Sequence, residues 1–169
     1  MNIKKISSRY TVKILDEEDI VDVYNLCRHN EQYYRYCPPF VTEESIKNDM
    51  IACPPGKTLS DKYYVGYYDG DKLLAVLDLI LDFPNERTAL IGFFMMDLKC
   101  QNKGLGSSIV SELSEALRKE KIDAIQLAWV QANPQPESFW HKNGFIETGD
   151  ISHMDNYTVV IAQKNLRSN

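Results

Sequence analysis

The stretch of sequence that decides the fold reads TALIGFFMMDLKCQNKGLGSSIV and spans residues 88 to 110. Its first part is an apolar run over residues 90–96, which predicts a strand buried on both faces. A turn that contains Gly104 and Gly106 follows, and a segment of helical period begins near Leu105. Glycine lets the backbone adopt positive φ and approach a ligand closely. The order of strand, glycine-containing turn and helix start makes this stretch the first candidate for a binding site.

A helix start of this kind binds phosphate. The first N–H groups of a helix have no partner inside the helix, and the helix dipole favours an anion beside them. Each hydrogen bond from such an amide to a phosphate contributes roughly 1.5–3 kcal/mol. The alternative is that Gly104 and Gly106 only make a tight turn between strand and helix. The G-x-G pattern alone does not decide between these two interpretations.

Composition and charge exclude several classes of protein. Of 169 residues, 44% are hydrophobic and 25% are charged, which is ordinary for a globular protein, and we expect a single domain over residues 1–169. The net charge of −5 argues against nucleic acid as the main partner, because phosphate contacts need clustered Lys and Arg. No apolar run approaches the roughly 20 residues of a membrane span. The first residues, MNIKKISSRY, lack the apolar stretch of a secretory signal, so we expect neither a signal peptide nor a membrane partner.

The cysteines indicate neither a metal site nor a disulfide framework. The chain has four of them and no C-x-x-C pair, and their spacing fits neither a zinc site nor a small disulfide scaffold. Reduced thiols in a cytoplasmic protein are the expected state, and no metal is expected. The four residues are Cys27, Cys37, Cys53 and Cys100.

The residues before the central stretch predict one strand and two helices. The strand covers residues 10–15. Asp16 is a good N-cap, and apolar residues follow it at helical spacing over residues 17–29. Residues 31–40 contain three tyrosines, a phenylalanine and two prolines, and they predict an ordered aromatic loop. Thr42 caps a second helix over residues 43–52, which ends before Pro54.

From residue 63 the apolar period changes to two. Strands over residues 63–68 and 72–81 are joined by a hairpin turn and form an antiparallel meander with the central strand. A helix over residues 105–120 leads to a strand over 124–130, which is expected to run parallel to the central strand because a helix joins the two. A short helix (137–143) and a late hairpin (145–147 and 157–163) follow. The predicted fold class is α+β: a single mixed, twisted, mostly antiparallel sheet with helices on both faces.

Two motifs, separated by one helix and one strand, carry a family resemblance. The turn Gln101-Asn102-Lys103-Gly104-Leu105-Gly106 matches the pattern R/Q-x-x-G-x-G/A. The segment NPQPESFWHKNGF, residues 133–145, keeps the Asn, the Phe and the final Gly-Phe of N-x-x-A-x-x-F-Y-x-x-x-G-F. On these residues the chain resembles the GNAT superfamily of acyl-CoA-dependent N-acetyltransferases. With the order of the predicted elements, the resemblance covers nearly the whole chain and implies the acyl-CoA N-acyltransferase fold.

The resemblance implies acetyl-CoA as a cosubstrate and a site that holds it. The backbone of Met96 and Leu98, with Asp97 between them, would pair with the pantetheine arm as though the arm were an added strand. Asn133 would hydrogen-bond the arm or help to place the acceptor, and the alternative for Asn133 is a helix N-cap. The amides of the turn and of the helix start would hold the pyrophosphate, and they belong to Gln101, Asn102, Lys103, Gly104, Leu105, Gly106 and Ser107.

Acetyl transfer to an amine by direct attack in a ternary complex has three chemical needs. The amine must be neutral, although a free alkylammonium has a pKa of about 10.4. The oxyanion of the tetrahedral intermediate needs hydrogen-bond donors, and the leaving thiolate benefits from a proton. The backbone N–H of Met96 is the predicted oxyanion donor.

The residues that move protons depart from the family pattern. Where many family members carry a tyrosine as the acid, this chain has Trp140, whose indole N–H cannot act as an acid near neutral pH. Trp140 is predicted to pack against the thioester end or the acceptor, or alternatively to be a core aromatic. Asp78 interrupts an apolar run and is a candidate base. An acid there lies either on the solvent face of the strand, which is the favoured prediction, or in a cleft. Tyr34 is a candidate hydroxyl on the acceptor side, and it has the alternative of packing a helix on the sheet.

The sequence supports one principal hypothesis and two alternatives. The principal hypothesis is an N-acetyltransferase that acts on a primary amine of a small molecule. A peptide or protein N-acetyltransferase is a variant of the same class. A non-catalytic acyl-CoA-binding sensor or subunit is the alternative from a different class, and Trp140 and the lack of an obvious base motivate it. The protein is expected to be a monomer or a homodimer.

Overall fold

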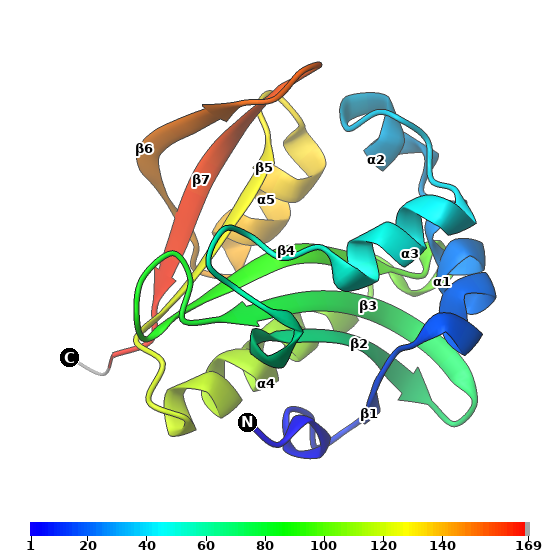
Figure 1. Ribbon diagram of the computed structural model, residues 1–169, viewed down its shortest axis with the longest axis horizontal. Helices are drawn as coiled ribbons and strands as arrows, with labels where there is room; N and C mark the ends of the chain where they lie inside the picture. The colour runs from blue at the N-terminus through cyan, green and yellow to red at the C-terminus, as the bar shows by residue number, and fades with distance from the viewer. Residues whose placement is uncertain (168–169) are drawn as a thin grey trace.

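One sheet of seven strands organises the computed structural model, which describes residues 1 to 167 (Figure 1). The strand order is β1-β2-β3-β4-β5-β7-β6. Strands β4 and β5 run parallel, and the other neighbours run antiparallel, as the sequence predicts. The strands are β1 (Thr11–Ile14), β2 (Lys62–Asp69), β3 (Lys72–Leu81), β4 (Thr88–Met96), β5 (Ala124–Val130), β6 (Ile146–His153) and β7 (Thr158–Asn165).

Helices cover both faces of the sheet. They are α1 (Ile20–Cys27), α2 (Glu31–Tyr36), α3 (Glu43–Ile51), α4 (Leu105–Lys119) and α5 (Pro134–Lys142). Helix α2 corrects the sequence analysis, which predicts an aromatic loop there. Its residues show no helical period, and the six-residue helix is stabilised by packing of its aromatic side chains, described below. Helix α5 begins earlier than predicted, because Asn133 caps it and a proline occupies its first turn.

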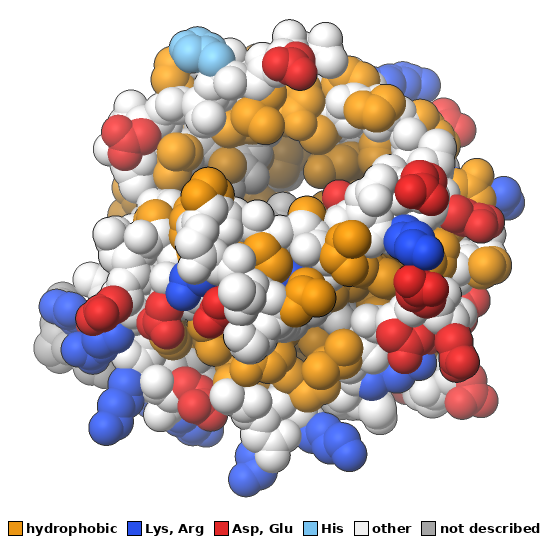
Figure 2. Space-filling view, in the orientation of Figure 1, with side chains coloured by type: hydrophobic (Ala, Val, Ile, Leu, Met, Phe, Trp, Pro, Cys, Tyr) orange, Lys and Arg blue, Asp and Glu red, His pale blue; other side chains and the backbone are white. Residues whose placement is uncertain are grey.

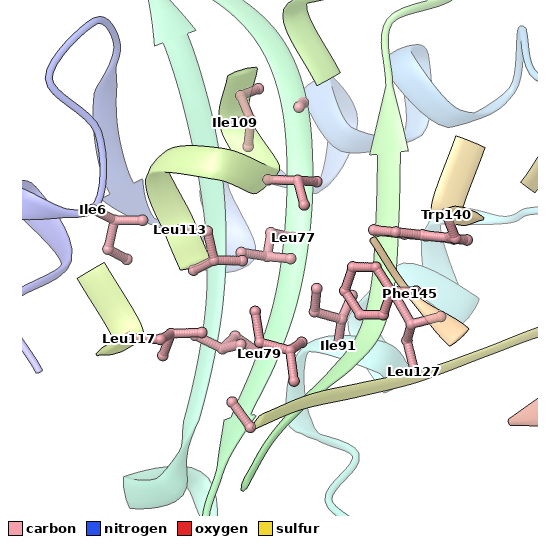
Figure 3. Packing of buried hydrophobic residues seen from close by; sticks show 14 of the residues in the cluster. Ile6, Leu77, Leu79, Ile91, Ile109, Leu113, Leu117, Leu127, Trp140 and Phe145 are labelled. Atoms are coloured by element: carbon pink, nitrogen blue, oxygen red, sulfur yellow. The ribbon is translucent and has the colours of Figure 1, made fainter. Parts of the chain in front are cut away.

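Two hydrophobic clusters, one on each face, hold the helices to the sheet. Helices α1 and α3 share a cluster with Val76 of β3 and Met95 of β4. Helix α4 lies on the opposite face, where Leu113 and Leu117 meet leucines of β3 (Figure 3). The prediction of helices on both faces is therefore confirmed. None of the helices in residues 1–167 has the length and hydropathy that a membrane-spanning helix needs.

The parallel strands β4 and β5 separate halfway along their length. They pair only over four positions, from Thr88 with Ala124 to Ile91 with Leu127. Strand β4 then continues to Met96 along β3 alone, and β5 continues along β7 (Figure 1). The pairing of β3 with β4 shifts register next to Gly92, and a bulge of this kind bends a strand. The sheet therefore opens between the two strands beyond Ile91.

Candidate functional site

The opened half of β4 has one edge without a neighbouring strand. The N–H of Asp97 donates to the carbonyl of Leu74 at 2.8 Å, which places Asp97 opposite β3 in a hydrogen-bonded pair. Hydrogen-bonded pairs alternate along an antiparallel ladder, so the amide groups of Phe94 and Met96 point the other way, into the opening. The N–H of Met96, the predicted oxyanion donor, therefore faces the free edge.

Leu98 does not continue this edge. It begins a 3-10 turn, Leu98–Cys100, and its carbonyl accepts a hydrogen bond from the N–H of Gln101 at 3.3 Å. The Asp97 carboxylate forms an ion pair with Lys72 at 2.9 Å and also accepts from the N–H of Lys99. The free edge predicted for residues 96–98 therefore ends at Met96, and Asp97 secures the turn that follows.

The turn leads into α4, and the first backbone N–H groups of this helix have no backbone hydrogen-bond partner among the described residues. The first bond inside the helix runs from the N–H of Ser108 to the carbonyl of Gly104, so the amides of residues 105–107 precede it. Gly104 has φ +80°, which favours glycine, and a Cβ built there meets no atom within 4 Å. Asn102 also has positive φ. The N–H groups of Asn102, Lys103 and Gly104 likewise donate to no backbone carbonyl among the described residues. The geometry of a phosphate-binding helix start is present, and binding of an anion there stays a prediction.

Gly106 differs from Gly104 in its structural role, because it lies in close contact with neighbouring elements. A Cβ at Gly106 would lie 2.7 Å from the Sδ of Met96 and 3.1 Å from the ring of Phe139. Glycine therefore lets the first turn of α4 pack closely against the end of β4 and against α5. Gly106 therefore serves close packing, whereas the positive φ of Gly104 agrees with the tight-turn interpretation and the open space beside Gly104 leaves room for a ligand.

Asn133 and Trp140, the two candidates in the second motif, are both buried. Asn133 is 2% exposed, and its side chain accepts from the N–H of Gln135, which makes it the N-cap of α5. Trp140 is 6% exposed and packs edge-on against Phe139 and Phe145. The alternatives of a helix cap and a core aromatic agree with these positions. A role for either residue toward the cosubstrate is not visible in their contacts.

Asp78 lies inside the protein, so its predicted place on the solvent face is wrong. It forms a 2.7 Å ion pair with Lys62, whose side chain is 2% exposed. Burial raises the pKa of the Asp78 carboxyl, and the hydrogen bond from Lys62 opposes that rise. The other carboxylate oxygen, Oδ1, has no partner among the described residues. A Cβ at Gly92, on the bulged strand, would lie 2.8 Å from Oδ2, so glycine there makes room for the pair.

An aromatic cluster, here called the aromatic wall, lies beside the opened half of β4 and is formed by Tyr33, Tyr34, Phe40 and Phe93. The ring centroids of Tyr33 and Phe93 are 6.0 Å apart, and those of Tyr33 and Tyr34 and of Tyr34 and Phe40 are 5.0 Å apart. Burial raises the pKa of both phenols, so neither ionises near neutral pH. Figure 2 shows a hollow bordered by hydrophobic side chains, between the region of α2 and that of α5. Tyr34 packs against the hydrophobic cluster under α1 and α3, where its hydroxyl lies beside the buried Cys27, and this agrees with the alternative in which it packs a helix on the sheet.

Sequence reasoning missed two residues of the site, Lys62 and Asn30. Lys62 is a lysine at the start of an apolar strand, and nothing local to it indicates a buried partner. Asn30 is 6% exposed and donates to the carbonyl of Met96 from 66 residues away in the chain. No pattern in the sequence connects Asn30 with Met96.

Comparisons with known proteins agree with this geometry. A family model described as "Acetyltransferase (GNAT) family" matches residues 21–145. No curated protein matches the chain by sequence. An acetyltransferase from Thermus thermophilus superposes with a TM-score of 0.74 at 15% identity, over 98% of this chain and 99% of that one.

Two further solved structures of similar fold contain ligands. PaiA N-acetyltransferase from Thermoplasma acidophilum, in complex with coenzyme A, has a TM-score of 0.68 at 16% identity, over 92% of this chain and 98% of that one. Spermidine N-acetyltransferase from Vibrio cholerae, in complex with CoA and spermine, has a TM-score of 0.69 at 18% identity, over 95% and 97%. At these identities the superpositions show a shared fold.

Proposed function

The chain belongs to the acetyltransferase (GNAT) family, and from this we propose that it transfers the acetyl group of acetyl-CoA to a primary amine of a small molecule. The amine attacks the thioester directly in a ternary complex. A C–N bond forms, the C–S bond of the tetrahedral intermediate breaks, and CoA leaves as the thiol once it has gained a proton. The Thermoplasma and Vibrio structures, which contain CoA, support this choice of cosubstrate.

The observation that carries the proposal is the free edge of β4 that leads to the uncovered start of α4. The pantetheine arm has amide groups that can pair with the free edge at Phe94 and at the N–H of Met96 as an added strand does, while the carbonyl of Met96 is already bonded to Asn30 and Gln101. The pyrophosphate at the other end of the arm is an anion, and the amides of residues 105–107 together with the helix dipole suit it. Both features lie in one continuous stretch of chain, so a single extended ligand satisfies them together.

Three groups are proposed to act on the reacting atoms or the acceptor. The N–H of Met96 is proposed to stabilise the oxyanion, because it points into the opening at the free edge. Asp78 is the candidate base, since its pKa is raised and one carboxylate oxygen has no partner among the described residues. Tyr34 is proposed to face the acceptor through its neutral ring, since its hydroxyl lies beside Cys27. The indole N–H of Trp140 cannot act as an acid near neutral pH, so water is proposed to supply the proton to the thiolate.

Release of free thiol from acetyl-CoA tests the proposal. Purified protein is incubated with acetyl-CoA and a panel of small amines, polyamines and peptides, and each reaction is compared with an amine-free blank. Turnover with a small amine supports the proposal. Turnover with peptides alone, confirmed by mass spectrometry of the modified peptide, would show that the acceptor is a peptide and not a small molecule. Saturable acetyl-CoA binding without turnover on any amine would favour the non-catalytic alternative.

A further inference from the structure

Asn30 joins the two sides of the opening. It stands between α1 and α2, where its N–H donates to the carbonyl of Cys27 and its own carbonyl accepts from the N–H of Tyr33. The backbone of Asn30 therefore ends one helix and begins the next. Asparagine at such a position commonly caps the second helix with its side chain. Here the side chain makes no cap bond to α2, so it is free for another use.

The side chain of Asn30 instead reaches across to β4 and to the phosphate-binding turn. Its Nδ2 donates to the carbonyls of Leu26 and Met96, at 3.1 Å each. Its Oδ1 accepts from Nε2 of Gln101 at 2.7 Å. The orientation of the amide follows from these partners, because a flipped amide would set an oxygen against two carbonyl oxygens. With its donors used and 6% of the residue exposed, Asn30 is a fixed connection.

Gln101 completes a chain of side-chain bonds that runs from α2 to α5. It donates to Asn30 and, at 3.3 Å, to the carbonyl of Met96, and its Oε1 accepts from Gln135 at 3.2 Å. Gln101 also opens the turn whose amides are proposed to hold the pyrophosphate. Met96 is the last residue of the free edge. A CoA molecule bound as proposed would touch both residues that Asn30 holds.

The other end of this connection is the aromatic wall. Helix α2 starts directly after Asn30 and carries Tyr33 and Tyr34. Six residues are too few for a helix to be stable by itself, so the position of α2 depends on its attachments. Asn30 is one of these attachments, together with the packing of Tyr33 on Phe93. A shift of Gln101 or Met96 is therefore transmitted to the start of α2.

We propose that Asn30 is a positioning residue that couples occupation of the CoA site to the order of α2 and hence of the aromatic wall. The inference rests on the proposed function, because it takes CoA as the ligand of the turn. Coupling of two sites needs a contiguous element that both ligands bias. Asn30, hydrogen-bonded to Gln101 and Met96 on one side and continuous with α2 on the other, is that element.

Hydrogen–deuterium exchange with and without CoA tests the coupling. In the wild type, saturating CoA should slow exchange in the turn (101–107) and also in α2, with a change at α2 of about tenfold, within the usual range of coupling between sites. The variant Asn30→Leu keeps a similar volume but loses the three side-chain bonds. It should bind CoA and protect the turn, while α2 exchanges at the same rate with and without CoA. Asn48→Leu, at an exposed position of α3, is the matched control and should behave as the wild type.

A second variant keeps the test decisive if Asn30→Leu does not fold. Gln101→Leu removes the connection from the turn while the bond from Asn30 to Met96 stays, and at CoA concentrations that saturate this variant it should reduce the CoA-dependent protection of α2. The proposal is overturned if either folded variant protects α2 as the wild type does. It is also overturned if CoA protects the turn of the wild type and leaves α2 unchanged. Absence of CoA binding to the wild type is a separate result, which would overturn the proposed function together with the inference.

Discussion

The buried pair of Lys62 and Asp78 allows a prediction whose magnitude follows from the structure. Asp78→Leu leaves the ammonium of Lys62, whose side chain is 2% exposed, without its 2.7 Å partner. Breaking a buried pair by removing one member costs roughly 3–5 kcal/mol. We expect the lower half of this range, because Asp49 of α3 is close enough for Lys62 to affect its pKa and keeps some compensating charge nearby. In a domain of this length the loss corresponds to a fall in Tm of about 6–16 °C.

The double variant Lys62→Met/Asp78→Leu separates the structural role of the pair from a chemical one. Replacing both charges with apolar side chains of similar volume is commonly neutral or stabilising, so we expect urea unfolding to show most of the lost stability restored. If Asp78 is the base, the double variant is stable and inactive in the thiol-release assay. If it keeps full turnover, Asp78 is a structural residue only. A single variant that loses less than about 1 kcal/mol, or a double variant as unstable as Asp78→Leu, would refute the reasoning.

Two further predictions concern the packing and the acid stability of α4. Gly106→Ala should lower the free energy of unfolding by about 1–2 kcal/mol, because the clash with Met96 and Phe139 outweighs the higher helix propensity of alanine. Urea unfolding checks this prediction, and a variant more stable than the wild type would contradict the close approach at Gly106. Glu112 accepts hydrogen bonds from Ser7 and Ser8. Burial raises the pKa of its carboxyl, but these bonds outweigh burial and the net shift is downward. A lowered pKa adds stability above the unfolded value, near 4.5, that is lost as the pH falls through the folded value. Glu112→Gln should therefore cost about 1 kcal/mol at neutral pH and less in acid, and equal losses at pH 7 and below pH 4 would show that the charge is irrelevant.

The regular part of the fold could be predicted from the sequence because its signals are local. The strands Lys72–Leu81 and Ala124–Val130 coincide with their predictions to the residue. Both are long apolar runs bounded by turn residues, and such runs have few alternative structures. The parallel pairing of β4 with β5 followed from the helix between them. The cap of α5 was available in the sequence as an alternative, since Asn followed by Pro is typical of a helix start.

The rest depended on contacts between distant residues. Helix α2 has no helical period, and its tyrosines are placed by Phe93 and Phe40 rather than by their neighbours in the chain. The face of Asp78 could not be predicted, because its partner Lys62 is sixteen positions earlier and lies beside it only when β2 pairs with β3. The role of Asn30 could not be predicted for the same reason, because its partners Met96 and Gln101 are 66 and 71 residues away in the chain.

The central claim is that the turn before α4 holds the pyrophosphate of CoA. Two substitutions at Gly104 isolate it. Alanine and glutamate both suffer the strain of φ +80°, roughly 1–2 kcal/mol, and both find open space for a Cβ. Glutamate alone adds bulk and negative charge where the pyrophosphate is proposed to lie.

Calorimetric titration of acetyl-CoA into the wild type, Gly104→Ala and Gly104→Glu is the most direct measurement. We predict saturable binding to the wild type, binding to Gly104→Ala that is weaker by less than about tenfold, corresponding to about 1.4 kcal/mol, and no measurable binding to a folded Gly104→Glu. Equal affinity of the wild type and Gly104→Glu, or no binding to the wild type, would contradict the account.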